Sequence, residues 1–198
     1  MRVLVLLLAG LLAGCPGSSS AQKSAPQAPA PASSVKPSAP SGAVPARAPG
    51  SRATLTDPSA EDWVGPPLPL ARVVITDAFG APHRVEVEVA HTPELRQRGL
   101  MWRKSLASGK GMLFIFPYEV VQSFWMVNTF IPLDLLFIDD AHRVVGVVER
   151  AEPHTRTSRT VGIPSRYVLE VPGGWCEQKG IRAGARVTFE GLATIPIR

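Results

Sequence analysis

The hydrophobic residues in the second half of this chain recur with the period of β-strands. Residues 83–89 alternate strictly, with Val85, Val87 and Val89 on one face and Glu86 and Glu88 on the other, which is typical of a strand with one buried face. Shorter runs rich in Val, Ile, Leu and Phe have the same character. They predict strands over residues 72–76, 112–116, 122–127, 133–138, 143–149, 166–171 and 186–190.

Two short helices are predicted between these strands. Thr92 and Pro93 suit the N-cap and first position of a helix that ends before Gly99, since a hydroxyl caps the first turn and glycine ends the last. Residues 174–179, closed by Gly180, predict a second helix. Seven or eight short strands with two brief helices favour a mostly β (α+β) fold, built as a small closed or nearly closed antiparallel β-barrel-like domain.

The most apolar run outside the first fifteen residues is 122–139, QSFWMVNTFIPLDLLFID. It predicts two strands, and Pro132 precedes the second because proline cannot donate to a ladder. Asp134 shares one face of that strand with Leu136 and Ile138. Burying an unpaired polar group costs roughly 2–7 kcal/mol, so Asp134 is either a structural ion-pair partner, with Arg98 or Arg103 as candidate cations, or a functional acid.

The first fifteen residues, MRVLVLLLAGLLAGC, combine one Arg, a short apolar run and small residues, as a cleaved export signal does. Their ending, Leu12-Ala13-Gly14-Cys15, resembles the bacterial lipobox, which implies that Cys15 is acylated and becomes the first residue of the mature chain. We therefore expect an exported, membrane-anchored lipoprotein. The residue after Cys15 is Pro16 and not an Asp, which by resemblance to enterobacterial lipoprotein sorting implies the outer membrane, facing the periplasm.

Residues 16–50 contain 8 Pro, 9 Ala and 8 Ser, with no acidic and no aromatic residue. Such a segment cannot bury enough apolar surface to offset its ordering entropy. We predict a disordered tether over residues 16–69, whose last part, 61–69, is a candidate for lying along the domain surface, and one folded domain over residues 70–198.

Charge and residue spacing exclude several functions. The formal net charge is +5, and the segment from Leu70 onward has 16 basic and 13 acidic residues. This excess of positive charge is too small and too dispersed along the sequence for a nucleic-acid partner. No His, Cys or carboxylate pair has zinc-ligand spacing, and no cofactor is expected. Thioethers favour Cu(I), so methionines together with His91 and Cys176 are a conceivable copper site. We prefer the interpretation that these methionines fill the core, because Met in apolar segments usually does so. With Cys15 acylated, Cys176 has no intramolecular disulfide partner.

Five blocks of the domain resemble the prokaryotic family known as domain of unknown function 192 (DUF192). They are ELRQRGLMWRKSL, GMLFIFP, SFWMVNTFIPLDLLFID, RVVGVVE and YVLEVPGGWCEQKGIRAGARV, in this order. The resemblance implies a small mostly β domain, often exported, with no established activity or ligand. The family usually has Lys where this chain has Val127, which argues against a mechanism that needs an amine there.

Polar residues within these blocks form the candidate site. If the first helix packs near the turn at Asn128, an Arg, a Trp and an Asn would line one concave, mostly apolar rim, as ligand sites do. The alternative is a buried Arg–Asp pair that orders the core. The candidate ligand-binding or structural residues are Arg98, Trp102, Arg103, Trp125, Asn128, Thr129, Asp134, Glu149 and Glu170.

Two functional classes follow from the sequence. The first is a tethered envelope lipoprotein whose single β domain binds a small ligand, a glycan or a protein partner. The second is an envelope hydrolase or transferase that uses Asp134 or Glu149 as general acid or base. The absence of a second carboxylate at informative spacing near Asp134 favours the first class. The oligomeric state is left open.

Overall fold

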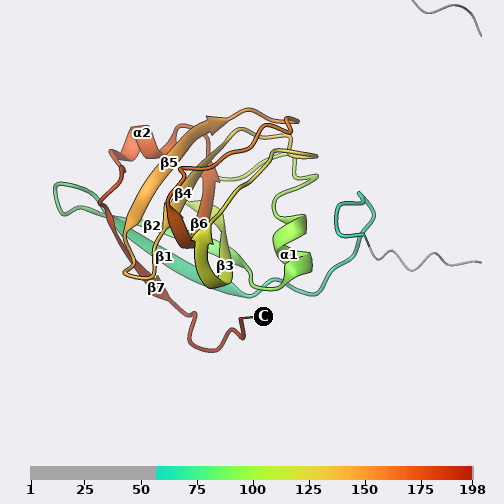
Figure 1. Ribbon diagram of the computed structural model, residues 1–198, viewed down its shortest axis with the longest axis horizontal. Helices are drawn as coiled ribbons and strands as arrows, with labels where there is room; N and C mark the ends of the chain where they lie inside the picture. Colours follow the sequence, from blue (N-terminus) through green and yellow to red (C-terminus); the bar gives the residue numbers. More distant parts are fainter. Residues whose placement is uncertain (1–56, 198) are drawn as a thin grey trace, which may run out of the picture. The chain divides into compact units, whose positions relative to one another are not determined.

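The computed structural model describes residues 57–197, and their secondary structure is one sheet with two short helices (Figure 1). The helices are α1 (Pro93–Arg98) and α2 (Trp175–Lys179). The strands are β1 (Leu70–Thr76), β2 (Pro82–Ala90), β3 (Lys110–Val121), β4 (Leu133–Ile138), β5 (Val144–Ala151), β6 (Pro164–Pro172) and β7 (Arg186–Glu190). The mostly β prediction and both helices are confirmed.

The sheet is mixed and not closed, so the prediction of a closed or nearly closed antiparallel β-barrel-like domain holds only loosely. Its strand order is β5-β4-β6-β3-β2-β1-β7. All neighbours pair antiparallel except β2 and β3, which are parallel because α1 carries the chain across between them. The sheet curls until the turn before β5 approaches β7, where Arg143 and Arg186 form an isolated bridge. No continuous ladder joins these two edge strands.

Two predicted strand boundaries are wrong. Pro117 does not end β3, because the pairing with β6 shifts register between Ile115 and Val120 and the proline falls within this irregularity, where no donor is needed. Residues 122–127 form no strand of the sheet. Instead, Phe124 exchanges backbone hydrogen bonds with Arg159, at 2.9 and 2.7 Å, in the long loop after β5.

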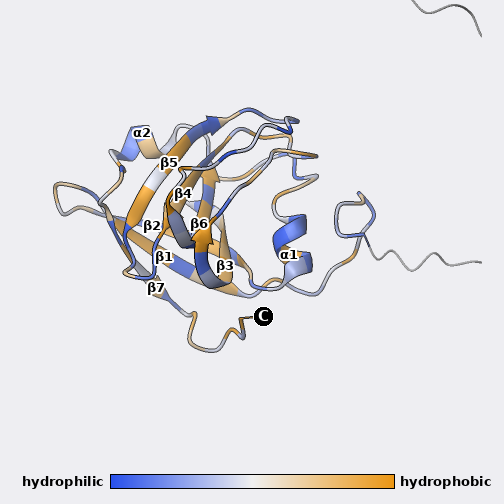
Figure 2. Cartoon of the chain, in the orientation of Figure 1, coloured by the Kyte–Doolittle hydropathy of each residue, from blue (hydrophilic) through white to orange (hydrophobic). Residues whose placement is uncertain are grey.

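Apolar side chains pack on both faces of the sheet, and the strands carry many hydrophobic residues (Figure 2). Along β4 every residue is buried, and successive side chains point to opposite faces. Leu136 and Ile138 join the core that includes Trp175 of α2, whereas Leu135 and Phe137 join the core that includes Leu95 of α1. The two helices thus close different parts of the sheet.

Residues 57–69, called the strap here, lie along the domain before β1 begins. Val89 of β2 donates its backbone N–H to the Pro69 carbonyl at 2.9 Å. Trp63 and Leu68 pack against the core that contains Leu95. The remainder of the tether predicted for residues 16–69, like Cys15 and the export signal, lies outside the described residues. In the described part of the chain no helix has the length and apolarity to cross a membrane.

Candidate functional site

The helix α1 carries two arginines to one edge of a cavity. Its N-cap, Thr92, accepts a hydrogen bond from the Leu95 N–H at 3.3 Å, and Pro93 fills the first turn. The helix ends at Gly99, whose φ of +47° is in the region that favours glycine. A Cβ at this position would lie 3.1 Å from Cζ of Phe114. The glycine therefore lets the end of α1, with Arg96 and Arg98, approach the aromatic floor on β3.

The opposite edge is built by two loop segments that bind each other. The Met126 N–H donates to the Thr155 carbonyl at 2.9 Å, and the hydroxyls of Ser123 and Ser158 are 2.7 Å apart. Trp125 lies between these contacts with 56% of its surface exposed. The segment that the sequence predicted as a strand is therefore a cavity wall.

Between α1 and these loops lies a cavity of about 560 Å³. This volume is within the usual range of small-molecule sites, about 300–1,000 Å³. The residues around it come from α1, β3, β6 and the two loops: Arg96, Gln97, Arg98, Gly99, Leu100, Met101, Phe114, Phe116, Ser123, Phe124, Trp125, Thr129, Arg156, Ser158 and Glu170. Its lining combines aromatic and aliphatic side chains with guanidinium, amide, hydroxyl and carboxyl groups.

Glu170 is the most unusual residue of this cavity. It lies on β6 between Met112 of β3 and Leu135 of β4 and is only 5% exposed. Among the described residues, its carboxyl group has no hydrogen-bond or ion-pair partner. Burial raises its pKa from 4.5 to about 8, because desolvation disfavours the charged form. At neutral pH this side chain is therefore mostly a neutral acid that faces the cavity.

The two arginines of α1 are partly desolvated. Burial lowers the pKa of Arg96 and of Arg98, and the charge of Arg103 adds to the effect on Arg98. Arg96 donates to the Ile115 carbonyl at 2.9 Å, and its guanidinium lies over the Phe116 ring. Because the guanidinium group is strongly basic, both side chains keep their positive charge at physiological pH.

Asp134 lies elsewhere, and neither arginine that we predicted as its partner reaches it. It is fully buried, and its Oδ1 accepts the backbone N–H groups of Arg150 at 2.7 Å and Gly174 at 2.9 Å. Its Oδ2 accepts the Cys176 N–H at 2.8 Å. The carboxylate therefore ties the start of α2 and the end of β5 to β4, which is a structural role without an ion pair.

The strap occupies the donors of three other candidate residues. Arg98 donates to the carbonyls of Pro58, at 3.1 Å, and of Ala60. Trp102 Nε1 and Asn128 Nδ2 both donate to the Ser59 carbonyl, at 2.9 and 3.2 Å. These side chains thus bind the backbone of the strap.

The other residues that we predicted for the site lie in different parts of the domain. Thr129 is buried at the cavity wall and donates its hydroxyl to the Val127 carbonyl. Glu149 is exposed on β5 and lines none of the cavities described here. Cys176 is buried beside Asp134, and burial, together with that charge, raises its thiol pKa. Within residues 57–197 no group of His, Cys, Asp and Glu could hold a metal ion.

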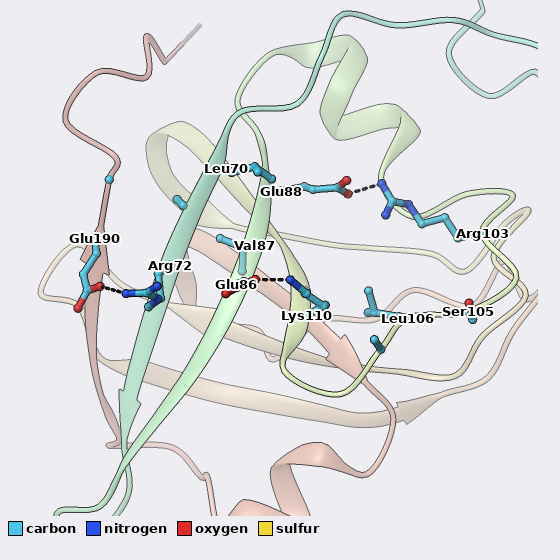
Figure 3. A pocket seen from close by; sticks show the side chains of 14 residues that line it. Leu70, Arg72, Glu86, Val87, Glu88, Arg103, Ser105, Leu106, Lys110 and Glu190 are labelled. Carbon is cyan, nitrogen blue, oxygen red and sulfur yellow. Dashed lines mark hydrogen bonds and ion pairs between the residues drawn. The ribbon is translucent and has the colours of Figure 1, made fainter.

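A larger hollow of about 710 Å³ lies over β1, β2 and the loop after Trp102 (Figure 3). Its charged side chains close on one another: Arg72 binds Glu190 at 3.0 Å, Lys110 binds Glu86, and Arg103 binds Glu88. Each of these six side chains remains at least 31% exposed, and none is a buried group without a partner. This surface has its charges satisfied, so we place the candidate site at Glu170.

Sequence reasoning named Arg98, Trp125, Thr129 and Glu170 of this cavity but missed its aromatic floor and its second loop. Phe114, Phe116 and Phe124 look like core residues in the sequence. Arg156 and Ser158 lie in the long loop over residues 152–163. Loops of that length are often functional, which was the one available signal.

The sequence of this domain matches the model of a known protein family. Residues 74–189, most of the described domain, match DUF192, described as "Uncharacterized ACR". The chain belongs to the DUF192 family. Arg98, Phe114, Trp125, Arg156 and Glu170 all lie within the matched segment, whereas the strap precedes it. The candidate cavity is thus built by the DUF192 domain itself.

Two solved structures are similar to this chain. One, from Sinorhizobium meliloti 1021, is described as a candidate transcription regulator; it is 34% identical, with a TM-score of 0.62, over 64% of this chain and 98% of its own. The other, from Novosphingobium aromaticivorans DSM 12444, is a protein of unknown function, 34% identical with a TM-score of 0.59 over 61% of this chain and 86% of its own. No curated protein matches this chain.

Proposed function

We propose that this protein is a membrane-tethered envelope lipoprotein whose DUF192 domain binds a small ligand in the cavity between α1 and the Trp125 loop. Export and the lipid anchor rest on the lipobox at residues 12–15. The binding role rests on the cavity. A site on a soluble domain behind a Pro-rich tether is able to sample ligands at a distance from the membrane surface.

One observation carries the binding proposal: Glu170 is a nearly buried carboxyl group without a partner in a cavity of ligand size. Among the described residues, the fully enclosed side-chain atoms without a hydrogen-bond partner are Arg159 Nε and Ser165 Oγ, so the Glu170 oxygens are open to the cavity. A ligand is therefore able to exchange a hydrogen bond with this carboxyl group without displacing a protein partner.

An acid–base enzyme built on Asp134 or Glu149 has no comparable support. Both oxygens of Asp134 accept backbone N–H groups in the interior, and Glu149 lies on an exposed part of β5. A nucleic-acid role, suggested by the description of the Sinorhizobium relative, also fits poorly. From Leu70 onward 13 acidic residues nearly balance the 16 basic ones, and five of the basic residues form ion pairs with carboxylates: Arg72, Arg103, Lys110, Arg150 and Arg166.

Binding at this cavity is testable with small indole probes on the full chain in lipid nanodiscs. At about −0.3 kcal/mol per non-hydrogen atom, such a fragment is expected to bind with a Kd near 1 mM. Ser158→Trp should abolish binding, because this exposed rim position is at the cavity mouth. Isothermal titration calorimetry, with empty nanodiscs as the blank, measures the effect.

Ser105→Trp is the matched control, since Ser105 is also exposed but lines the larger hollow of Figure 3. This variant should bind the probes as the wild type does. Loss of binding in Ser105→Trp with retention in Ser158→Trp would move the site to the other hollow. No binding of any indole probe to the wild type would count against the proposed function.

Lipid anchoring gives a second prediction. Cys15→Ala should abolish incorporation of radiolabelled palmitate and shift the protein from the membrane fraction to the soluble fraction, because it removes the only thiol at the lipobox. Cys176→Ala should leave labelling unchanged, since that thiol is buried in the domain. Labelling that persists in Cys15→Ala would refute the lipoprotein assignment.

A further inference from the structure

The charges around the cavity are mostly of one sign. Three arginines line it, Arg96 and Arg98 from α1 and Arg156 from the long loop, and Glu170 is its only acidic residue. The cause of the raised pKa of Glu170 is burial, with no contribution from a neighbouring charge. Arg156 is exposed and Arg96 and Arg98 are half-buried, whereas Glu170 is only 5% exposed. The arginines therefore lie toward the mouth, and Glu170 lies in the interior.

Two of these arginines have no carboxylate partner in the described part of the chain. Arg98 forms hydrogen bonds only with carbonyl oxygens of the strap, at Pro58, Ala60 and Glu61. Arg156 is exposed and takes part in no hydrogen bond or ion pair among residues 57–197. This contrasts with the hollow of Figure 3, where every basic residue of the lining has its acid.

The interior of the cavity suits a flat apolar group. Phe114 and Phe116 contact Phe124 edge to face, with ring centroids 5.0 and 6.2 Å apart. Trp125 extends this aromatic surface toward solvent at the mouth. Aromatic walls hold a planar body mainly by burying its apolar surface, with a smaller directional part from ring–ring contacts.

We propose that the ligand of this cavity is an organic anion with a flat, apolar body, an inference that rests on the proposed binding function. The anionic group would lie at the mouth beside Arg156 and Arg98, and the body would lie against Phe114 and Phe124. A polar atom of the body would exchange a hydrogen bond with the Glu170 carboxyl group. A neutral Glu170 leaves the mouth positive overall, which disfavours a cationic ligand.

Three probes that share one aromatic body test this inference. Indole-3-propionate, tryptophol and tryptamine carry an anionic, a neutral and a cationic end group on the same ring system. With the full chain in nanodiscs at pH 7 and low salt, calorimetry should give indole-3-propionate a Kd at least tenfold lower than that of tryptamine, with tryptophol between them. Raising the salt should narrow this difference, because exposed charges are screened.

Arg156→Gln should reduce the preference for the anion severalfold and leave the Kd of tryptophol unchanged. Arg182→Gln is the charge-matched control, since Arg182 is exposed in the turn before β7 and lines none of the cavities described here. It should keep the full preference for the anion.

The outcomes separate the two proposals. Tryptamine or tryptophol binding as tightly as indole-3-propionate, with loss of binding in Ser158→Trp, overturns the anion inference and leaves the binding function standing. An equal loss of preference in Arg156→Gln and Arg182→Gln also overturns the inference, because the effect would then be one of net charge. Absence of all binding overturns the proposed function itself.

Discussion

Replacing Asp134 by alanine is expected to lower the free energy of unfolding by about 3–5 kcal/mol. Its two oxygens accept three backbone N–H groups, from Arg150, Gly174 and Cys176, and each buried donor left without an acceptor costs about 1–3 kcal/mol. The melting temperature should fall by about 6–20 °C, at roughly 2–4 °C per kcal/mol for a domain of this size. Chemical denaturation and thermal melts measure both quantities.

Asparagine at position 134 tests the geometry behind this result. Its single carbonyl oxygen is able to replace Oδ1 for Arg150 and Gly174, but its NH₂ group would face the Cys176 N–H in place of Oδ2. Asp134→Asn should therefore lose stability, but less than Asp134→Ala. Asp140→Ala, which breaks a half-exposed ion pair with Arg166, should cost less than about 1 kcal/mol. A wild-type melting temperature in Asp134→Ala would contradict the structural role.

Glu170 should make the wild-type domain less stable as the pH rises. Its pKa is about 8 in the folded chain and near 4.5 when solvated, so between these values the folded state holds more protons than the unfolded state. The free energy of unfolding must then decrease with increasing pH, by up to about 1.4 kcal/mol per pH unit, or a few kcal/mol over the interval. The cavity arginines keep their charge throughout this range.

Glu170→Gln should remove this dependence, because the amide stays neutral at every pH. Near pH 4 the variant and the wild type should unfold at similar denaturant concentrations, and at pH 8.5 the variant should be the more stable by a few kcal/mol. Glu149→Gln, a surface change on β5, should follow the wild-type curve. Parallel curves for Glu170→Gln and the wild type would show that Glu170 is ionised in the folded protein.

The features predicted correctly from the sequence are local ones. The alternation at Val85, Val87 and Val89 identified β2, and Thr92 with Pro93 identified the start of α1, because neighbouring residues alone determine both patterns. The parallel pairing of β2 with β3 escaped prediction, since it depends on where the chain returns after the helix. The same applies to the continuation of β3 past Pro117, which depends on an irregularity in its pairing with β6.

The partners of Asp134 escaped prediction for a different reason. We looked for a cationic side chain, because arginines are visible in a sequence, but the true donors are backbone N–H groups. Every residue except proline has such a group, so no residue type marks them. For Glu170 the sequence does mark the residue but not its surroundings. Alternation along β6 puts Glu170 on the face away from Tyr167 and Leu169, but only the assembled sheet shows that this face opens into a cavity.

The strap determines where mechanical load would enter this domain. A pull on the chain upstream of Asp57 would first reach the hydrogen bonds that Arg98, Trp102 and Asn128 make to residues 58–60. These bonds would break one after another, as in peeling, before force reached β1, which is flanked by β2 and β7. Arg98 also lines the cavity. A pull on the strap would thus release this guanidinium while the sheet was still intact, and it would change the mouth of the cavity before it unfolded the domain.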